Sequence, residues 1–358
     1  MALPYVKINF ANGAIGGSEP MDDGVTLMVL GGSGDDLDVQ NLTDYRRQIG
    51  NATESPEVVA FYNEANGNAR LIVTHCELTD VALKNKLSEY NGDIRTVVIN
   101  GVAAAATINL LQNVAEWSAE TLFAPVLMLV GATAALIEDT ANFKTLEKNR
   151  VSVVDCVADA DGTALLYYVA GRLAVSPVQR SAGRVKDGAL YATAFKTAGG
   201  DLVDNIYAEP RHTKGLVTAR TYTGKAGFYI SDDLMATPAT DDYALTPRRR
   251  TIDKAYRIAY QTLVNYINDE IPVTSGGGIP SDTCKNIENS VERAIYAQMT
   301  VNGNLGIDSN NPSDTGVTCY IDPSQDVVST SRLNVTIKVK PYGYAKYIEV
   351  NLGFSTEA

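Results

Sequence analysis

Five short predicted strands, separated by segments of helical length, constrain the fold of this chain more than any other feature. The strands cover residues 25–30, 71–74, 94–99, 125–130 and 151–157. The first and fourth of them are almost entirely apolar, which is typical of strands buried on both faces of a sheet. The segments with helical patterns between and after them cover residues 41–49, 56–65, 79–90, 103–122, 133–147 and 164–173. This alternation predicts an α/β domain with a mainly parallel sheet covered by helices on both faces.

The C-terminal third has a different pattern. Two amphipathic helices are predicted at residues 251–269 and 282–299, the first with Ile252, Ala255 and Ala259 on one stripe. A short strand at residues 317–321 and an alternating terminal stretch follow the helices. Helices followed by strands, rather than a regular alternation of the two, predict an α+β domain.

The alternating terminal stretch spans residues 332–354. Apolar residues stand at every second position in two runs, which are separated by a turn containing Pro341 and Gly343. The apolar positions are Leu333, Val335, Ile337 and Val339, then Ile348, Val350, Leu352 and Phe354. The pattern predicts a half-buried hairpin. Because the second strand lies at the chain end, it either stays in its own sheet or adds to the sheet of a neighbour.

A second short strand is predicted at the other end of the chain. Val6, Ile8 and Phe10 lie on one face of it, and a glycine-rich connector at residues 13–17 follows.

Residues that carry chemistry are few, and their arrangement does not predict an enzyme, a cofactor site or a metal site. The two histidines have no nucleophile correctly placed beside them, and the four cysteines form no CxxC pair. Gly31, Gly32 and Gly34 follow a buried strand, where a phosphate-binding loop would lie. This loop, residues 31–36, supports an alternative reading as a nucleotide-binding protein or enzyme. However, it lacks the GxGxxG and GK[ST] patterns and continues into Asp35 and Asp36.

The net charge of the chain excludes one class of partner. The formal net charge of −12 argues against nucleic acid, which needs a basic surface. No apolar run approaches the roughly 18 residues of a membrane span, and no secretory signal is predicted. Residues 246–358 contain 11 basic and 12 acidic residues, so nearly all the excess acid lies before them. The basic residues that cluster at the start of this part are Arg248, Arg249, Arg250, Lys254 and Arg257.

The order of these parts resembles that of contractile tail sheath proteins, the sheath family of phage tails, tailocins and contractile injection systems. The opening resemblance is an apolar strand ending in glycines, a helix with an aromatic residue that ends in Gly50, and a helix that ends in Asn66-Gly67. The C-terminal resemblance lies in TPRRRTIDKAYRIAYQTLVNYI, SDTCKNIENSVERAIYAQMTVNGNL and RLNVTIKVKPYGYAKYIEVNLGF. The chain departs from the family at the approach to the last strand, where it has Lys346, Tyr347 and Ile348.

The resemblance implies a structural subunit that polymerises around an inner tube and contracts to drive the tube through a target envelope. It implies an N-terminal arm at residues 1–20 that joins the C-terminal domain, an outer α/β domain at 21–245 and an inner, tube-facing domain at 246–358. It also implies a sheet in the inner domain that is completed by strands exchanged between subunits. The residues implied in exchange are Val6, Ile8, Phe10, Leu333, Val335, Ile337, Val339, Ile348, Val350, Leu352 and Phe354.

The implied partners are other copies of the chain, an inner tube protein, and baseplate and tail-terminator or cap proteins. Assembly is expected in the bacterial cytoplasm. The candidate tube contacts are the basic cluster and the polar face of the next helix: Arg248, Arg249, Arg250, Lys254, Arg257, Lys285, Glu288, Glu292 and Arg293. Another polymerising tail or capsid component, and the nucleotide-binding reading, remain as alternatives.

Overall fold

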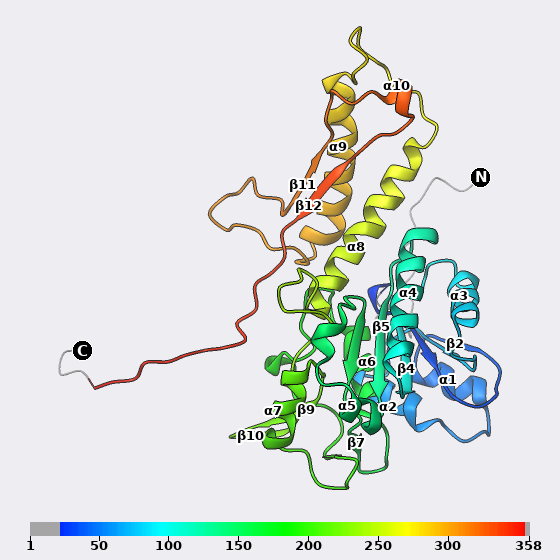
Figure 1. Ribbon diagram of the computed structural model, residues 1–358, viewed down its shortest axis with the longest axis vertical. Helices are drawn as coiled ribbons and strands as arrows, with labels where there is room; N and C mark the ends of the chain where they lie inside the picture. The colour runs from blue at the N-terminus through cyan, green and yellow to red at the C-terminus, as the bar shows by residue number, and fades with distance from the viewer. Residues whose placement is uncertain (1–21, 355–358) are drawn as a thin grey trace, which may run out of the picture. The chain divides into compact units, whose positions relative to one another are not determined.

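The computed structural model describes residues 22–354, which divide into two units at Arg257 and Ile258. We call residues 22–257 the N-terminal unit and residues 258–354 the C-terminal unit. Figure 1 traces the chain through both. The division falls inside helix α8 (Thr246–Leu263). The predicted domain borders at residues 20 and 245 stay predictions, and the predicted N-terminal strand lies outside the described residues.

A six-stranded sheet forms the centre of the N-terminal unit. Its strands lie in the order β2-β3-β1-β4-β5-β6, and all neighbours are parallel except β2 and β3. The strands are β1 (Thr26–Val29), β2 (Leu37–Val39), β3 (Leu71–Thr74), β4 (Thr96–Val102), β5 (Leu127–Ala132) and β6 (Val151–Val154). The predicted mainly parallel sheet is confirmed, and the five predicted strands supply its five parallel strands. The short antiparallel strand β2 is not predicted by the sequence pattern.

Helices cover both faces of this sheet. Successive strand residues point to opposite faces, so Met28 joins one apolar core while Leu27 and Val29 join the other. Helices α1 (Leu42–Ile49), α2 (Pro56–Glu64) and α6 (Leu165–Val175) contribute to the first core. Helices α3 (Asp80–Glu89), α4 (Ala105–Thr121) and α5 (Ala134–Asp139) contribute to the second. The predicted helix at residues 133–147 is in fact α5 and a separate 3₁₀ turn, η2 (Phe143–Leu146).

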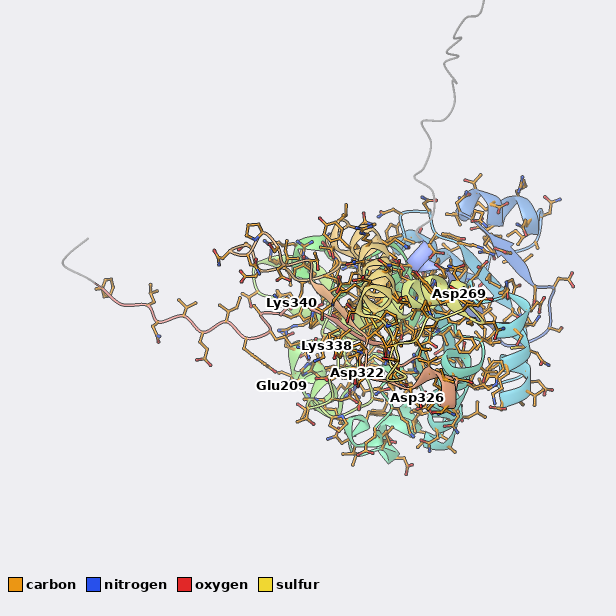
Figure 2. All side chains as sticks on the ribbon, turned by 90° about the horizontal axis from the view of Figure 1, so that it is seen from above. Glu209, Asp269, Asp322, Asp326, Lys338 and Lys340 are labelled. Atoms are coloured by element: carbon orange, nitrogen blue, oxygen red, sulfur yellow. The ribbon has the colours of Figure 1, made fainter. Side chains whose placement is uncertain are left out.

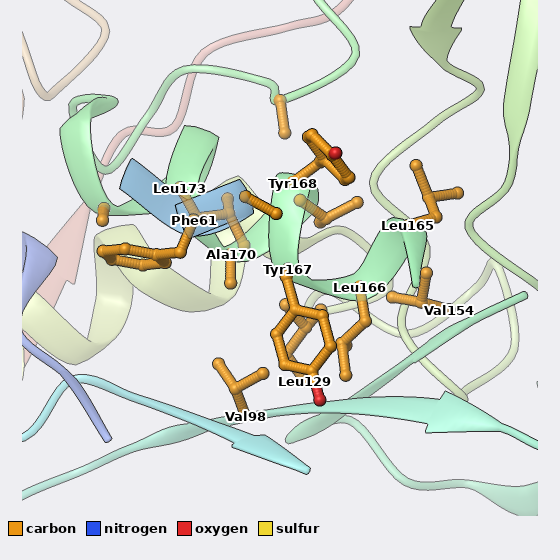
Figure 3. Packing of buried hydrophobic residues seen from close by; sticks show 14 of the residues in the cluster. Phe61, Val98, Leu129, Val154, Leu165, Leu166, Tyr167, Tyr168, Ala170 and Leu173 are labelled. Atoms are coloured by element: carbon orange, nitrogen blue, oxygen red, sulfur yellow. The ribbon is translucent and has the colours of Figure 1, made fainter. Parts of the chain in front are cut away.

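Helix α6 is the most deeply buried helix of this layer. Ten of its residues, Leu165 through Ala174, are buried, as expected for a helix that is apolar on all sides. Figure 3 shows its Leu165 and Leu166 among the sheet residues Leu129 and Val154. A Cβ atom on Gly171 would overlap the carbonyl oxygen of Phe61. Glycine therefore allows α6 and α2 to pack at close range.

The rest of the N-terminal unit is made of short elements. They are η1 (Asp22–Gly24), β7 (Ala158–Asp159), η3 (Val185–Asp187), β8 (Phe195–Lys196), α7 (Asn205–Lys214), β9 (Ala219–Tyr222) and β10 (Lys225–Ile230). The pairs β7–β8 and β9–β10 are antiparallel. These small sheets accompany the main sheet without extending it.

The C-terminal unit is a small α+β arrangement, as predicted. It holds the end of α8, the 3₁₀ turn η4 (Val264–Tyr266), α9 (Ser281–Ile295), the π-helical turn η5 (Tyr296–Thr300), β11 (Val317–Tyr320), α10 (Val327–Thr330) and β12 (Thr336–Val339). Its core contains Ile279, Cys284, Ile287 and Ile321, with Leu333 and Val335 packed against it. Both predicted helices are present with shifted ends.

Candidate functional site

The two strands of the C-terminal unit form a minimal antiparallel sheet. Val317 lies opposite Val339 and Cys319 opposite Ile337, so these four side chains share one face. Val317 and Cys319 are buried and Ile337 and Val339 half-buried. The predicted alternation of the first terminal run is therefore confirmed, because β12 pairs inside the chain with β11. A two-stranded sheet leaves two edges, and the two edges differ here.

The outer edge of β11 is closed by carboxylates of α9. The Cys319 N–H donates to Oε1 of Glu292 over 2.7 Å, and the Ile321 N–H donates to Oε1 of Glu288 over 2.8 Å. Glu288 and Glu292 are four residues apart, so they lie on one face of the helix. The other oxygen of Glu288 accepts from Lys285. An added strand would need the same backbone N–H groups, so this edge is not free to bind one.

Replacing Glu288 tests this closure. Glu288→Ala leaves the buried Ile321 N–H without an acceptor, which should cost about 1–3 kcal/mol of unfolding free energy. Glu288→Gln keeps an acceptor oxygen and should cost less. Urea unfolding measures both, and hydrogen exchange in the peptide containing residues 317–321 should be faster in the alanine variant alone. Equal exchange in the two variants would contradict the closure.

The same carboxylate sets a pH dependence. Burial raises the pKa of Glu288, but the bonds from Lys285 and from the Ile321 N–H outweigh burial and hold it below its ordinary value of 4.5. The carboxylate therefore stabilises the fold fully above pH 4.5, and this contribution is lost as the pH falls through the lower pKa of the folded state.

The outer edge of β12 is open. Backbone groups of alternate residues point to the same side of a strand. Because Cys319 and Ile321 direct theirs away from β12, the backbone groups of Ile337 and Val339 must point away from β11. Within residues 22–354, no strand pairs with this side of β12. The edge therefore presents main-chain donors and acceptors that an added strand can use.

The segment after β12, residues 341–354, is called the tail. The predicted hairpin does not form: β12 pairs with β11, and residues 348–354 adopt no strand and make no backbone hydrogen bond to another described segment. Figure 2 labels Lys338 and Lys340, beyond which the tail extends. The exposed fractions of Ile348, Val350, Leu352 and Phe354 are 79%, 76%, 95% and 112%. Burying each such side chain fully would contribute about 1.5–3 kcal/mol of favourable free energy. The alternating apolar residues of the tail therefore favour contact with a partner surface, and the described part of the chain does not supply one.

The predicted basic cluster lies largely inside the N-terminal unit rather than on its surface. Arg250 donates to the carbonyl oxygens of Leu173 and Ser176 over 2.9 and 3.0 Å. Lys254 and Arg257 both bind the carboxylate of Asp23. These cations thus have partners within the chain, as a buried cation requires, and contact of the cluster with a tube stays a prediction.

The remaining predicted contact residues divide between interior and surface. Arg249 is buried and paired with Asp253, and Glu288 is buried at the β11 edge. Glu292 and Arg248 are both half-buried, while Lys285 and Arg293 are exposed. Only Lys285 and Arg293 are thus fully on the surface. Sequence reasoning missed Asp23, which organises the cluster, because nothing local marks it as a partner for residues more than 200 positions away.

The loop at residues 31–36 has no nucleotide-site geometry. It leads into strand β2 rather than into a helix whose N-terminal N–H groups could meet a phosphate. Asp36 accepts from Thr74 and Lys86, and His75 contacts the Gly31 carbonyl through Nδ1. The alternative reading as a nucleotide-binding protein gains no support. Across residues 22–354, no helix combines the length and apolar character needed to cross a membrane.

The comparisons with known proteins agree with this architecture. Residues 3–234 match the model of the DUF2586 N-terminal domain, and residues 242–358 match that of the DUF2586 C-terminal domain. No curated protein matches the sequence.

Solved structures match over nearly the whole chain. A chain of the anti-feeding prophage (AFP) baseplate aligns with a TM-score of 0.66 at 12% identity, covering 99% of this chain and 100% of its own. A chain of the PVC sheath complex, from an extracellular contractile injection system in the contracted state, aligns with a TM-score of 0.66 at 14% identity, covering 100% and 99%. A sheath tail protein from Desulfitobacterium hafniense aligns with a TM-score of 0.55 at 12% identity, covering 93% and 99%. The chain therefore has the fold of contractile sheath-type proteins, and the resemblance is confirmed at the level of fold.

Proposed function

The chain belongs to the DUF2586 family, and we propose that it is the structural subunit of a contractile sheath. The observation that carries the proposal is the coexistence of an open strand edge on β12 and an exposed apolar tail in one chain of sheath-type fold. The tail of one copy adds to the β12 edge of a second, and the N-terminal residues Val6, Ile8 and Phe10, which lie outside the described residues, supply a further strand.

Strand addition suits a polymer that must change shape. Main-chain hydrogen bonds give the link its strength, and the burial of alternate side chains fixes its register. The tail and the β12 edge are different surfaces, so each copy gives a strand to one neighbour and receives one from another. Such a heterologous contact generates a ring if the rotation closes and a helical array if it does not. Closure of the β11 edge restricts addition to one side of the sheet.

The polymer surrounds an inner tube and contracts to drive that tube through a target envelope. Tube contacts involve the exposed residues of α9, Lys285 and Arg293, since most other members of the predicted set are engaged within the chain. Contacts between exposed charges are weak and screened by salt, which suits an attachment that contraction must release. Baseplate and terminator proteins cap the two ends, and assembly occurs in the bacterial cytoplasm.

Imaging of the purified protein tests the assembly role. The full-length chain, alone and co-expressed with the tube protein from the same genome, should form regular tubes or stacked rings in negative stain. The tube protein should lie inside the assemblies that form in its presence. Discrete single-subunit particles under both conditions, at concentrations where the chain remains folded by circular dichroism, would refute the sheath role.

A further inference from the structure

A small cavity in the N-terminal unit is surrounded by buried cations. Its volume is about 10 Å³, which is the space of roughly one water molecule. Its lining combines three apolar residues, Pro125, Leu127 and Val178, with five charged ones, Asp23, Arg95, Arg250, Asp253 and Arg257.

Positive charge exceeds negative charge around this cavity. The residues that line it include three arginines, Arg95, Arg250 and Arg257, and two aspartates, Asp23 and Asp253. Asp23 also binds Lys254, and Asp253 also binds Arg150 and Arg249. Two further acids lie near the lining arginines: Asp22 binds Arg95, and the charge of Asp233 acts on Arg250. The lining itself thus carries one more positive than negative charge. Unbalanced charge is costly to bury, so the site needs either solvent or further negative charge.

Two buried donors at the cavity have no partner among the described residues. Nη1 of Arg250 and Nε of Arg95 are fully covered and make no hydrogen bond. Arg250 is 6% exposed, and its Nη2 is already committed to the carbonyl oxygens of Leu173 and Ser176. Burial and the neighbouring charge of Arg95 lower the pKa of Arg257 to about 10, although Asp23 and Asp253 oppose the shift. Both observations indicate a deficit of negative charge at this point.

We propose that the cavity binds one small inorganic anion of halide size, with chloride as the physiological occupant. The ion accepts from the unpaired donors of Arg250 and Arg95 and offsets the excess of cations. The cavity is too small for phosphate or sulfate, and water would satisfy the donors without offsetting the charge. The ion would hold α8, which carries Arg250 and Arg257, to Arg95, which directly precedes β4.

Anion exchange at constant ionic strength separates binding from screening. The thermal midpoint of the full-length chain is measured in mixtures of sodium chloride and sodium gluconate, in which the total salt never changes. Binding to the folded state alone predicts a rise of the midpoint with the logarithm of chloride concentration. Bromide should act like chloride, whereas sulfate should have no effect beyond that of ionic strength. Identical midpoints in chloride and gluconate would overturn the proposal.

A variant that supplies its own anion makes the test independent of loss of folding. Val178 lines the cavity and is 2% exposed, and aspartate has a similar size. Val178→Asp should fold, and its midpoint should be insensitive to chloride because the carboxylate replaces the ion. Val178→Asn has the same shape without the charge and should keep the response to chloride. If Val178→Asp is less stable than Val178→Asn in gluconate, the cavity does not favour negative charge and the proposal fails.

Discussion

A chain that lacks residues 348–358 is expected to remain a folded monomer and to form no tubes or rings. The deleted residues include four apolar side chains that are at least 76% exposed, and residues 348–354 make no backbone hydrogen bond to another described segment. Their removal should therefore leave the unfolding midpoint of the monomer unchanged and remove the link between copies. Size-exclusion chromatography with light scattering, together with negative stain, measures assembly, and circular dichroism measures folding. Intact polymers from this variant would refute addition of the tail to a neighbour.

Substitutions in the full-length chain test whether assembly needs the apolar side chains of the tail or only the presence of the segment. Replacing Ile348, Val350, Leu352 and Phe354 by serine removes the apolar contacts and should abolish assembly as the deletion does. Replacing Glu349 and Asn351 by serine alters the opposite side of the same segment and should leave assembly intact. An equal loss of assembly in the two variants would mean that the alternation of apolar and polar residues in the tail does not determine its contact with the neighbouring copy.

The receiving edge can be blocked separately. Ile337→Pro removes an N–H that points away from β11, so the pair of β11 and β12 can persist while a third strand loses a donor. This variant keeps its tail but cannot receive one, whereas the deletion variant can receive a tail but has none. Mixing the two should give discrete complexes with one subunit of each and no polymer. This complementation identifies tail and edge as the two halves of a single contact.

The local patterns predict the N-terminal unit well for a clear physical reason. Strands buried on both faces are mostly apolar, and each of the five predicted strands becomes a parallel strand. β2 escapes prediction because only Val39 of its three residues is buried. α7 escapes prediction because it contains Pro210 and only Ala208 is buried, so no apolar stripe marks it. Elements held by few buried side chains leave a weak pattern.

The candidate site shows where sequence patterns stop being informative. Period-two alternation correctly marks the first terminal run as a strand, but it cannot say whether residues 348–354 pair within the chain. Closure of the β11 edge depends on bonds between residues 27 and 33 positions apart. Burial of the basic cluster depends on Asp23, which lies 231 positions before Lys254. A run of arginines at a helix start carries no signal that separates a surface patch from a buried network.

The substitution Arg172→Met is expected to cause the largest loss of stability in the N-terminal unit, about 3–5 kcal/mol of unfolding free energy. Arg172 on α6 donates through Nε to Glu64 on α2 over 2.6 Å, and the two side chains are 8% and 4% exposed. Its Nη1 and Nη2 each donate over 3.0 Å to the carbonyl oxygens of Gly188 and Ala189. Methionine fills a similar volume but leaves a buried carboxylate and two carbonyl oxygens without their donors.

Urea unfolding of the full chain, followed by circular dichroism, measures this loss. Arg46→Met is the matched control, because Arg46 pairs with Glu54 at the surface and its removal should not move the midpoint. Adding Glu64→Leu to Arg172→Met removes the stranded carboxylate and should recover part of the lost stability, although the Tyr191 N–H then loses its acceptor. If Arg172→Met alone unfolds at the same urea concentration as the control, the buried pair does not hold α2 and α6 together. The expected recovery in the double variant would show that the lost stability comes from the unpaired charge of Glu64. The close packing around Gly171 is the same in both variants and so does not account for the difference.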